Sequence, residues 1–531
     1  MYNNYTPLQQ RQLALQGYSN TQSTYLLVCA SARSTALKAT LTDQLHRKFR
    51  LVDRLDGELT ASVDGVLLAA EDVELMSTAL MYFAKALQDG ADYAVCNAGF
   101  GGATALYQSQ PLQAQNRCAV VSRTLLERCR AAAHDPENVP ELLALAAQLC
   151  TKPALIPQAL LHYERGICAE DAFSAHGKRA FIMSHVLDMT GAPIVLVSAV
   201  PVLRSMGYEV LVLGPSDGGS LHLFLDAGAS VITRSSCRNV SDAWGMALCA
   251  DFVIVNTVVM ARAVRALSGT AVPVLWWLHD AFAGYPHIAH QIPTQLGENV
   301  RVYSVGSHAA NAMRAVRPEF EIRPLIYGLP DYAAENFVRT DLGYNRGRPL
   351  FATVGSFERR KGHDIFCKAI RLLPPEVRKK ASFLFVGQAA DKEMMDSVRT
   401  LTADYPENVF YCKRLTRDEI KSLMEQCTGL VCASRDDPMP TFVTEGLIFG
   451  KPSIVSEHTG TAGLISEGRN GFVYHDDDPQ QLAVLLEHAI KHPEELASMR
   501  TECRKMYEQY YSKEAFEQTL RAAVEDLTAK K

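Results

Sequence analysis

The sequence lacks the marks of secreted, membrane-spanning and zinc-binding proteins. None of its thirteen cysteines form a Cys-x-x-Cys pair, and its fifteen histidines show no metal-ligand spacing, so we expect no structural zinc. The apolar run nearest in length to a membrane span, "APIVLVSAVPVL" at residues 192–203, is too short to cross a bilayer. The N-terminal segment is polar and lacks the apolar core of a secretion signal.

An excess of charge of one sign is absent too. The formal net charge is −5 with 21% charged residues, which gives no general attraction to nucleic acid or to an anionic membrane. Cys29 and Cys432 lie inside apolar, strand-like runs, as buried free thiols of a reducing compartment do. We therefore expect a soluble, cytoplasmic protein without a nucleic-acid partner; weak peripheral association with the inner face of the membrane stays open.

What the sequence does contain is a repeated α/β pattern. At 531 residues the chain is too long for a single hydrophobic core. From about residue 179, short hydrophobic runs alternate with amphipathic helical patterns, which predicts parallel sheets covered by helices on both faces. The pattern occurs twice, so we expect two Rossmann-like, doubly wound domains facing a cleft, at residues 175–328 and 348–531, joined by a linker at residues 329–347. The second domain should end in a closing helix.

One candidate phosphate site lies in the stretch "GSFERRKGHD". Here Gly355, Ser356, Arg360 and Lys361 follow a predicted strand and precede a predicted helix. The N–H groups and the dipole at a helix start favour an anion, and the arginine and lysine side chains add positive charge. The alternative is a solvated basic turn without a ligand.

A second joint of this kind is "SRDDPMPTFVTEG". Pro440 suits the first turn of a helix, which leaves the amides of Thr441 and Phe442 available to an anion. Asp437 lies in the turn before that helix. In the alternative interpretation, Asp436 or Asp437 is only the N-cap of the helix.

Glu445 lies about one turn further along the same helix. Its neighbours Phe442, Val443, Leu447 and Ile448 are apolar, so most of this helix is expected to be buried. A carboxylate in such a place needs a partner, and the hydroxyl groups of a sugar would serve. A surface position for Glu445 is the alternative.

The order of these motifs resembles the donor domain of family 4 of the retaining glycosyltransferases, which have the GT-B fold. The matching stretches are "VGSFERRKG", "LVCASRDDPMPTFVTEGLIFGKPSIVS" and "EGRNGFVY". In that family an acid is followed by seven residues and then a glutamate, and Asp437 and Glu445 have this spacing. Earlier in the chain, "MSHVLDMTGAPIVL" resembles the family's first glycine loop, and "WWLHDAF" resembles its histidine-bearing strand end.

The resemblance implies a role for each matching residue of a nucleotide-sugar donor site. Arg360 and Lys361 would hold the donor pyrophosphate, helped by the amides near Thr441 and Phe442. Glu445 would accept hydrogen bonds from the nucleotide ribose.

The remaining roles concern the sugar and the base. Asp437 would contact hydroxyl groups of the transferred sugar, and Gly191 would let the backbone approach the donor. His279 would lie beside the sugar and the reacting oxygen, and the turn around Arg414 and Leu415 would meet the base through its backbone. The candidate catalytic residues are then His279, Asp437 and Lys361.

Two positions depart from the family pattern. The first acid is commonly glutamate, and the shorter Asp437 changes the reach to the sugar. An arginine often follows the glycine of the first phosphate loop, where this chain has Ser356. Some members with an Arg-Lys-Gly turn lack that arginine as well, so Arg360 would take its place. Both changes bear on which sugar is used.

The resemblance also implies a reaction. A hexose would pass from a nucleoside-diphosphate sugar to a saccharide, lipid-linked or glycoconjugate acceptor in polysaccharide or cell-surface glycan synthesis, with retention at the anomeric carbon. The leaving phosphate would accept the acceptor's proton on the same face, so neither a protein nucleophile nor a cofactor or metal ion is expected. We also expect the two domains to close over the donor.

Residues 1–174 form a third, less regular α/β region, with a helix expected at residues 36–49, "ALKATLTDQLHRKF". This helix, "LLAAEDVEL" and "LIPQALLHYERG" resemble parts of family 2 glycosyltransferases, which have the GT-A fold. Ala69 and Glu71 stand where that family has acids of its metal-binding motif, although Asp72 remains. We expect a truncated, non-catalytic region that serves homo-oligomeric assembly or acceptor positioning.

Two other functions stay open. A non-catalytic GT-B protein would act as a partner or scaffold in a glycosylation complex, and a GT-B sugar-nucleotide epimerase would share the fold. A scaffold would not need the set of charged residues at the donor site, and an epimerase would not need an acceptor groove. A glycosyltransferase is therefore the leading hypothesis.

Overall fold

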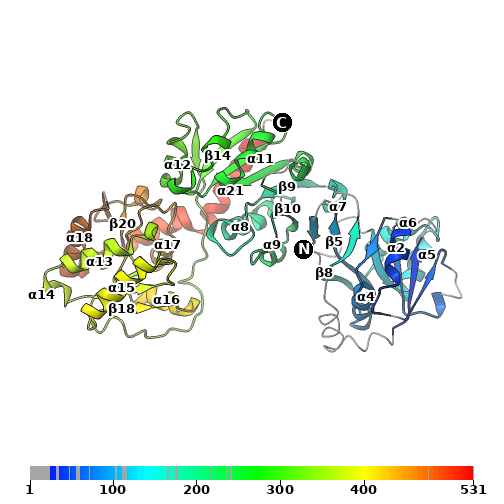
Figure 1. Ribbon diagram of the computed structural model, residues 1–531, viewed down its shortest axis with the longest axis horizontal. Coiled ribbons are helices and arrows are strands. Elements are labelled where there is room, and N and C mark those ends of the chain that lie inside the picture. The colour runs from blue at the N-terminus through cyan, green and yellow to red at the C-terminus, as the bar shows by residue number, and fades with distance from the viewer. Residues whose placement is uncertain are drawn as a thin grey trace. The chain divides into compact units, whose positions relative to one another are not determined.

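The computed structural model describes residues 24–529, apart from residues 31–34, 47, 56–59, 71, 102–103, 110–116, 164–166, 174–176, 217, 236, 239–241 and 476. The chain divides into two compact units, whose elements are labelled in Figure 1. The first unit runs to Val255 and includes the segment Thr270–Pro273; the second comprises Asn256–Gly269 and Val274–Lys531. Within the described ranges, no helix is both long enough and apolar enough to cross a membrane.

The N-terminal part of the first unit is an α/β structure. Its strands are β1 (Leu26–Ala30), β2 (Phe49–Val52), β3 (Gly65–Ala69), β4 (Glu74–Leu75), β5 (Tyr93–Phe100), β6 (Thr104–Tyr107), β7 (Cys118–Ser122) and β8 (Pro153–Tyr163). Its helices are α2 (Thr35–Leu41), α4 (Ala79–Gln88), α5 (Arg123–Ala132), α6 (Val139–Leu149) and α7 (Ala169–Ala172). Strands β2, β1 and β3 run parallel, whereas β7 pairs antiparallel with both β3 and β5.

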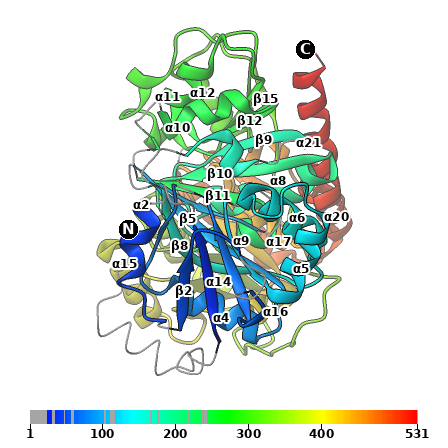
Figure 2. The same cartoon turned by 90° about the vertical axis from the view of Figure 1, so that its right-hand side faces the viewer.

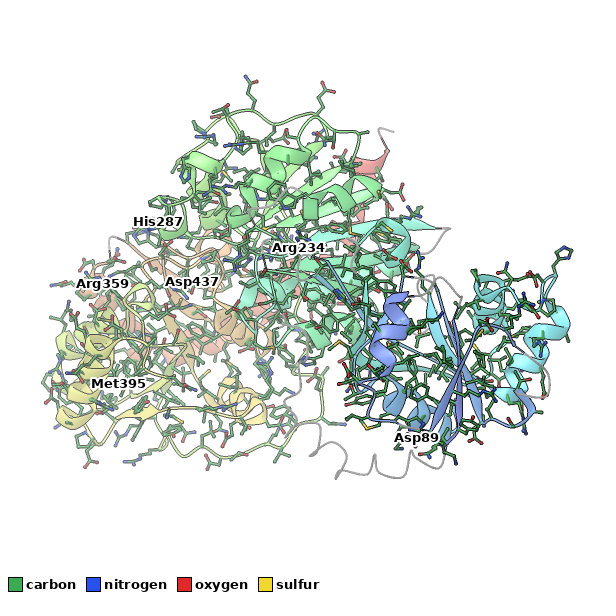
Figure 3. All side chains as sticks on the ribbon, turned by 45° about the vertical axis from the view of Figure 1, so that its right-hand side comes forward. Asp89, Arg234, His287, Arg359, Met395 and Asp437 are labelled. Carbon is green, nitrogen blue, oxygen red and sulfur yellow. The ribbon has the colours of Figure 1, made fainter. Side chains whose placement is uncertain are left out.

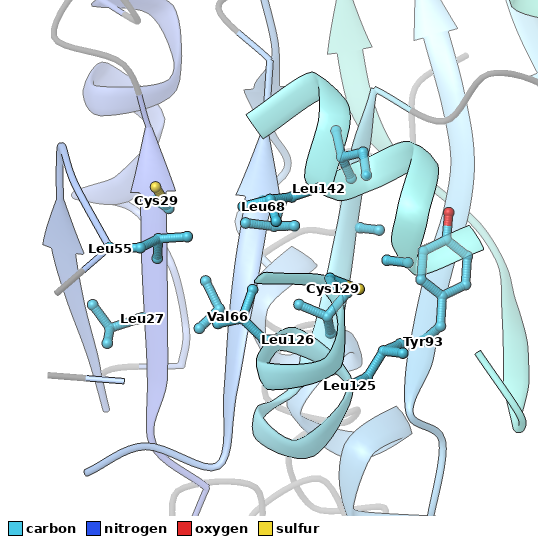
Figure 4. Close-up of a cluster of buried hydrophobic side chains, with 14 of the residues drawn as sticks. Leu27, Cys29, Leu55, Val66, Leu68, Tyr93, Leu125, Leu126, Cys129 and Leu142 are labelled. Carbon is cyan, nitrogen blue, oxygen red and sulfur yellow. The ribbon is translucent and has the colours of Figure 1, made fainter. Parts of the chain in front are cut away.

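Helices α5 and α6 cover one face of this sheet and enclose a cluster of buried apolar side chains (Figure 4). Residues two apart on a strand share a face, and Leu27 and Cys29 of β1 reach this cluster together, as do Val66 and Leu68 of β3. Leu125 of helix α5 is fully buried against them. Burial of a leucine side chain of this kind stabilises a fold by roughly 1.5–3 kcal/mol.

Helix α2 is shorter than expected. We predicted a helix over residues 36–49, but α2 ends at Leu41. The side chain of Gln44 instead bonds to two backbone groups far along the chain: Nε2 donates to the carbonyl of Met76 (2.9 Å), and Oε1 accepts the N–H of Leu80 (3.1 Å). These tertiary hydrogen bonds hold Gln44 in a non-helical segment, and they outweigh the local preference of the sequence for a longer helix.

The first unit continues with parallel strands, as expected for a Rossmann-like pattern. These strands are β9 (Lys178–Met183), β10 (Tyr208–Gly214), β11 (Ser230–Arg234) and β12 (Phe252–Asn256), in the spatial order β12–β9–β10–β11. The helices are α8 (Gly191–Ser205), α9 (Leu221–Asp226) and α10 (Asp242–Gly245). Strand β11 also pairs antiparallel with β6, and Nη1 of Arg234 donates to Oγ1 of Thr104 across this pairing (2.9 Å). The N-terminal region and the strands β9–β12 therefore share one sheet.

The second unit begins with three parallel strands. These are β13 (Val274–Leu278), β14 (Val300–Ser304) and β15 (Ile322–Pro324), with helices α11 (Ala261–Leu267) and α12 (Ser307–Arg314). The boundary between the units thus falls inside the range 175–328 that we expected to be one domain, and the domain bounds stay a prediction.

A second sheet of the same unit is parallel throughout. Its strands are β16 (Leu350–Val354), β17 (Ser382–Val386), β18 (Val409–Cys412), β19 (Gly429–Cys432), β20 (Ser453–Ser456) and β21 (Gly471–Tyr474), in the order β18–β17–β16–β19–β20–β21. The helices between the strands are α13 (His363–Leu372), α14 (Pro375–Arg378), α15 (Lys392–Asp404), α16 (Arg417–Gln426) and α17 (Thr441–Ile448), and α18 (Pro479–Lys491) and α19 (Pro493–Ser498) follow β21. This is the doubly wound arrangement predicted from the sequence.

Two helices close the chain, α20 (Arg500–Met506) and α21 (Lys513–Thr528), with a π-helical turn at residues 507–511 between them (Figure 2). Helix α21 packs against β13, where the ring of Phe516 stacks on Trp277 with 5.7 Å between ring centres. The closing helix therefore contacts the strand that leads to His279, in addition to ending the second unit.

Candidate active site

Most of the predicted donor-site residues lie just beyond the carboxyl ends of strands β16 and β19. These strands are neighbours in the sheet although β17 and β18 come between them in the sequence, so the strand order reverses at this point. Doubly wound sheets bind their ligands in the crevice at such a reversal. The loop after β16 carries residues 355–362, and the loop after β19 carries residues 433–440, including Asp437, which Figure 3 labels.

A glycine allows these two loops to touch. Gly362 has φ = 66°, in the left-handed region, and a Cβ at this position would lie 1.8 Å from the carbonyl oxygen of Ala433. A side chain larger than hydrogen therefore does not fit. Next to this contact, the N–H of Arg435 donates to the carbonyl of Arg360 (2.7 Å), which joins the two loops through their backbones.

Glu358 organises the predicted phosphate-binding side chains of the first loop. Nε of Arg360 donates to Oε2 of Glu358 (2.9 Å), and the hydroxyl of Ser356 donates to the same carboxylate. The N–H of Gly355 donates to the carbonyl of Val386 (2.9 Å) and fixes the start of the loop on β17. The Arg360 side chain is 42% exposed, so a ligand can reach its guanidinium.

Two of the predicted catalytic residues are in direct contact. Nζ of Lys361 lies 2.5 Å from Oδ2 of Asp437, and the Asp437 side chain is only 5% exposed. The backbone of Asp437 is held as well, because its N–H donates to the carbonyl of His458 (3.0 Å) and its carbonyl accepts the N–H of Gly460 (2.9 Å). The structure thus brings together a cation suited to phosphate and a carboxylate suited to sugar hydroxyls.

Glu445 is buried on helix α17 and has a protein partner that the sequence did not point to. Nη1 of Arg417 donates to Oε1 of Glu445 at 2.6 Å, and the Arg417 guanidinium also lies over the ring of Tyr332, 4.2 Å from its centre. The surface alternative for Glu445 is wrong, since the residue is 7% exposed. Burial raises the pKa of the Glu445 carboxyl above its usual value, although the charge and hydrogen bond of Arg417 lower it in part.

Helix α17 begins at Thr441, directly after Pro440. Neither aspartate of the preceding turn caps it, so the N-cap alternative is wrong: Pro440 occupies that position. The amides of Thr441 and Phe442 thus belong to the first helical turn, as expected. The hydroxyl oxygen of Thr441 lies 3.3 Å from the phenol oxygen of Tyr327, which orients the side chain at the helix start.

Arg414 and Leu415 lie in the loop between β18 and α16, at the same edge of the sheet. The thiol of Cys412 donates to the carbonyl of Arg414 (3.2 Å). Two residues after Leu415 lies Arg417, which binds Glu445. The segment predicted to meet the base therefore adjoins the residue that holds the predicted ribose-binding carboxylate.

His279 is the first residue after strand β13, and its ring packs 4.7 Å from that of Trp277. The next residue, Asp280, accepts the N–H of Val258 at 2.6 Å through Oδ2. Desolvation raises the pKa of the Asp280 carboxyl to about 6, although hydrogen bonds from the backbone of Val258 and His279 lower it in part. Residues 279–283 are termed the histidine loop below.

Asp436 is a functional candidate that sequence reasoning missed. Its carboxylate accepts hydrogen bonds from the N–H groups of Phe282 (3.1 Å) and Ala283 (2.8 Å) and from Nε2 of His308 (2.7 Å). Burial alone would raise the pKa of Asp436, but the bond from His308 and the two amides hold it below its usual value. The signal in the sequence is the doubled acid before Pro438, for which the sequence offers Asp436 only the alternative role of an N-cap.

Gly191 belongs to the first unit, where it opens helix α8. The loop before it is held by Asp188, whose Oδ1 accepts the N–H of Thr190 (3.1 Å). A Cβ at Gly191 would meet no atom within 4 Å, so space is open beside its backbone. The contact of Gly191 with a donor stays a prediction.

The N-terminal motif keeps one acid in an ion pair. Nη2 of Arg117 lies 3.0 Å from Oδ1 of Asp72, and Ala69 is the last residue of β3. Glu71 lies outside the described residues. In the described part of the chain, no group of three or more His, Cys, Asp and Glu side chains is arranged to hold a metal ion.

Comparison with known families finds two matches along the chain. Residues 176–316 match the model of glycosyl-transferase family 4, and residues 335–506 match the model of glycosyl transferases group 1. The two segments together make up more than half of the chain.

Two curated relatives match part of the chain. Spore coat protein SA of Bacillus subtilis is 27% identical over 157 residues, which cover 28% of this chain and 41% of the relative. An uncharacterized glycosyltransferase of Methanocaldococcus jannaschii is 26% identical over 197 residues, 36% of this chain and 53% of the relative. The chain thus spans about half the length of the curated relatives it matches.

Among solved structures, the HepE protein of Anabaena in complex with UDP-glucose is similar, with a TM-score of 0.53 and 16% sequence identity. The similarity covers 66% of this chain and 100% of that chain. At this identity the likeness concerns the fold, and it agrees with the two Rossmann-like domains predicted from the sequence. The GT-B fold is therefore confirmed.

Proposed function

Because residues 176–316 belong to glycosyl-transferase family 4 and residues 335–506 to glycosyl transferases group 1, we propose that this protein is a retaining glycosyltransferase. It moves a hexose from a nucleoside-diphosphate sugar to a saccharide, lipid-linked or glycoconjugate acceptor. The process that it serves is polysaccharide or cell-surface glycan synthesis. Its place of action is the cytoplasm or the inner face of the membrane.

One observation carries the proposal: the contact of Lys361 with Asp437 at the point where the strand order reverses. Glu445 lies on the helix that follows the same loop. The groups proposed to bind the phosphates, the sugar and the ribose lie at the edge of the sheet where a nucleotide is expected, which supports the proposal. The complex of HepE with UDP-glucose supports a nucleotide sugar as the donor and makes uridine nucleotides the first to test.

In the proposed reaction, the bond between the anomeric carbon and the phosphate oxygen breaks, and its electron pair stays on the diphosphate. The acceptor oxygen bonds to the anomeric carbon on the same face, and its proton passes to the leaving phosphate. Arg360, Lys361 and the first amides of helix α17 stabilise the negative charge on the diphosphate. The proposed reaction draws its positive charge from these groups and uses no metal ion or cofactor.

His279 and Asp437 act on the sugar side of this reaction. On donor binding, Asp437 exchanges the Lys361 ammonium for sugar hydroxyls, while Lys361 turns to the phosphates. His279, at the carboxyl end of β13, lies beside the reacting oxygen. Residues 1–174 take no part in catalysis and serve assembly or acceptor positioning.

The test is calorimetry and thermal shift with UDP, GDP, ADP and their hexose conjugates, followed by release of the nucleotide in the presence of acceptor saccharides. We expect one diphosphate to bind and Glu445→Ala to abolish its binding, because the ribose loses its carboxylate. The matched control is Glu487→Ala, which removes an exposed partner of Lys491 on helix α18 and should leave binding unchanged. Binding at a hundredfold excess over the dissociation constant should stabilise the wild type by about 2.7 kcal/mol.

If no nucleotide binds to well-folded wild type, the transferase proposal fails and the scaffold alternative takes its place. If a nucleotide sugar is converted without any acceptor to an isomeric sugar nucleotide, the protein is an epimerase. Retention is checked by the anomeric configuration of the product in a nuclear magnetic resonance spectrum.

A further inference from the structure

Asp436 joins the loop after β19, residues 433–440, to the histidine loop. The loop at residues 433–440 is termed the donor turn below. The Asp436 carboxylate accepts hydrogen bonds from the N–H groups of Phe282 (3.1 Å) and Ala283 (2.8 Å) and from Nε2 of His308 (2.7 Å). The partners lie 128 to 154 residues away in the sequence, and the Asp436 side chain is only 13% exposed. A buried carboxylate with three donors is held in one orientation, so it fixes the backbone just beyond His279.

The backbone of the same turn is fastened to the residues proposed to hold the donor phosphates. The N–H of Arg435 donates to the carbonyl of Arg360 (2.7 Å), and Nη1 of Arg360 lies 3.5 Å from the carbonyl oxygen of Asp436. The next side chain, Asp437, binds Lys361. Asp436 and Asp437 are thus adjacent carboxylates with different partners. Asp436 binds the histidine loop, and Asp437 binds Lys361 of the loop at residues 355–362.

The near end of the histidine loop is held independently of this turn. Asp280 accepts the N–H of Val258 (2.6 Å), and the ring of His279 packs against Trp277. At the far end of the loop, the N–H groups of Phe282 and Ala283 donate hydrogen bonds to the carboxylate of Asp436. The loop is therefore held at both ends, by strand β13 next to His279 and by the hydrogen bonds of Asp436 with Phe282, Ala283 and His308. These hydrogen bonds of Asp436 are termed the clamp below.

We propose that Asp436 is a positioning residue for sugar transfer, which holds the histidine loop at a set distance from the donor turn. This rests on the proposed function, because it assumes that His279 acts beside the sugar. A displacement of about 1 Å at a reacting centre can lower a rate by about 100-fold without any change in substrate binding. Asp436 therefore contributes to the rate of transfer and not to the affinity for the nucleotide.

The experiment compares kcat, donor KM and the dissociation constant of the diphosphate for variants of Asp436 and of His308, its side-chain partner. Asp436→Ala and Asp436→Asn should lower kcat by about 10- to 100-fold. Both should keep the diphosphate affinity within about twofold, because the positioned loop and not the phosphate site is disturbed. The asparagine variant loses activity since an amide nitrogen cannot accept the second backbone N–H.

His308 supplies a conservative rescue. His308→Gln keeps a side-chain N–H that can reach Asp436, so it should retain most of kcat, whereas His308→Ala should not. The double variant Asp436→Ala/His308→Ala should be no slower than Asp436→Ala alone, because both substitutions break the same clamp.

Asp92 provides the matched control. Its carboxylate also accepts two consecutive backbone amides, those of Thr151 and Lys152, both at 2.8 Å, but it lies in the first unit. Asp92→Ala should cost comparable stability and leave kcat unchanged. A general loss of fold integrity would lower kcat in both alanine variants, whereas positioning lowers it only for Asp436→Ala.

Two results would overturn the positioning role. One is a folded Asp436→Ala variant with the kcat of the wild type; the other is a fall in rate matched by an equal fall in diphosphate affinity. Hydrogen exchange of a peptide covering residues 279–285 gives a second readout without turnover: unchanged exchange in Asp436→Ala means that the clamp does not hold the loop. A wild type that binds no nucleotide overturns the proposed function itself, and that outcome is distinct from these two.

Discussion

At the scale of single residues, the carboxylates of the candidate site are matched with cations. Asp437 is paired with Lys361 and Glu445 with Arg417, and both carboxylates are buried. A buried carboxylate without a partner would destabilise the fold. Lys361 and Arg417 therefore stabilise the folded protein when no donor is bound. A donor that offers hydroxyl groups to Asp437 and phosphates to Lys361 can replace the contact between these two residues, because both charges keep a partner.

The first prediction concerns Arg417. Removing its side chain leaves Glu445 buried without its cation, so Arg417→Ala should lower the unfolding free energy by roughly 1–3 kcal/mol. The pKa of Glu445 already lies above its usual 4.5, so its native state binds a proton more tightly than its unfolded state, and its contribution worsens as the pH rises past that value. Without Arg417 this pKa rises further. The destabilisation should therefore be larger at pH 8 than at pH 5, as measured by urea unfolding.

The same variant should bind the nucleoside diphosphate more weakly by about tenfold, or ~1.4 kcal/mol, because loss of Arg417 raises the pKa of Glu445 further and so weakens it as a hydrogen-bond acceptor for the ribose. Arg417→Lys is the control, since it keeps the charge while losing the flat contact with Tyr332. Equal destabilisation of Arg417→Ala at both pH values would contradict the assigned pairing.

At the scale of secondary structure, the proposed phosphate site lies where two short loops are tightly packed against each other. The loop after β16 and the loop after β19 meet at Gly362, whose conformation and closeness to Ala433 leave no room for a side chain. The geometry of the site therefore depends on backbone contact between two loops as much as on charged side chains.

Gly362→Ala should for this reason cost more than a left-handed conformation alone. Gly468, in the same unit, has a similar φ of 71° and open space around it, so Gly468→Ala should lose only about 1–2 kcal/mol. Gly362→Ala should lose clearly more in urea unfolding and should also lose diphosphate binding, because the two loops must separate. Equal effects of the two substitutions would show that the contact between the loops is unimportant.

The sequence predicted the elements better than their contacts. Hydrophobic runs such as residues 382–386 and 429–432 predicted buried parallel strands, because strands covered on both faces need apolar residues throughout. The Asp437–Glu445 spacing predicted a candidate site on one loop and one helix, and the structure has these residues in the loop after β19 and on α17. The partners Arg417 and His308 stayed hidden, since they come from elements distant in sequence that only the folded sheet brings near.

At the scale of the whole molecule, the predicted site residues are divided between the two units. Gly191 lies in the first unit, whereas the other predicted donor-site and catalytic residues lie in the second. The first unit is itself extended by the N-terminal region, whose strand β6 continues the sheet at β11. Strand β6 therefore covers the edge of β11, which would otherwise be unpaired on that side.

The two domains predicted from the sequence, at residues 175–328 and 348–531, are expected to close over a bound nucleotide sugar, because Gly191 and His279 belong to the first and the phosphate-binding candidates to the second. We expect the radius of gyration from small-angle scattering to fall when the wild type is saturated with its nucleoside diphosphate or nucleotide sugar. Glu445→Ala should show no such change at the same ligand concentration, because it does not bind, and Asp436→Ala should still compact, because its defect lies in the histidine loop. An unchanged radius in saturated wild type would contradict the predicted closure of the two domains.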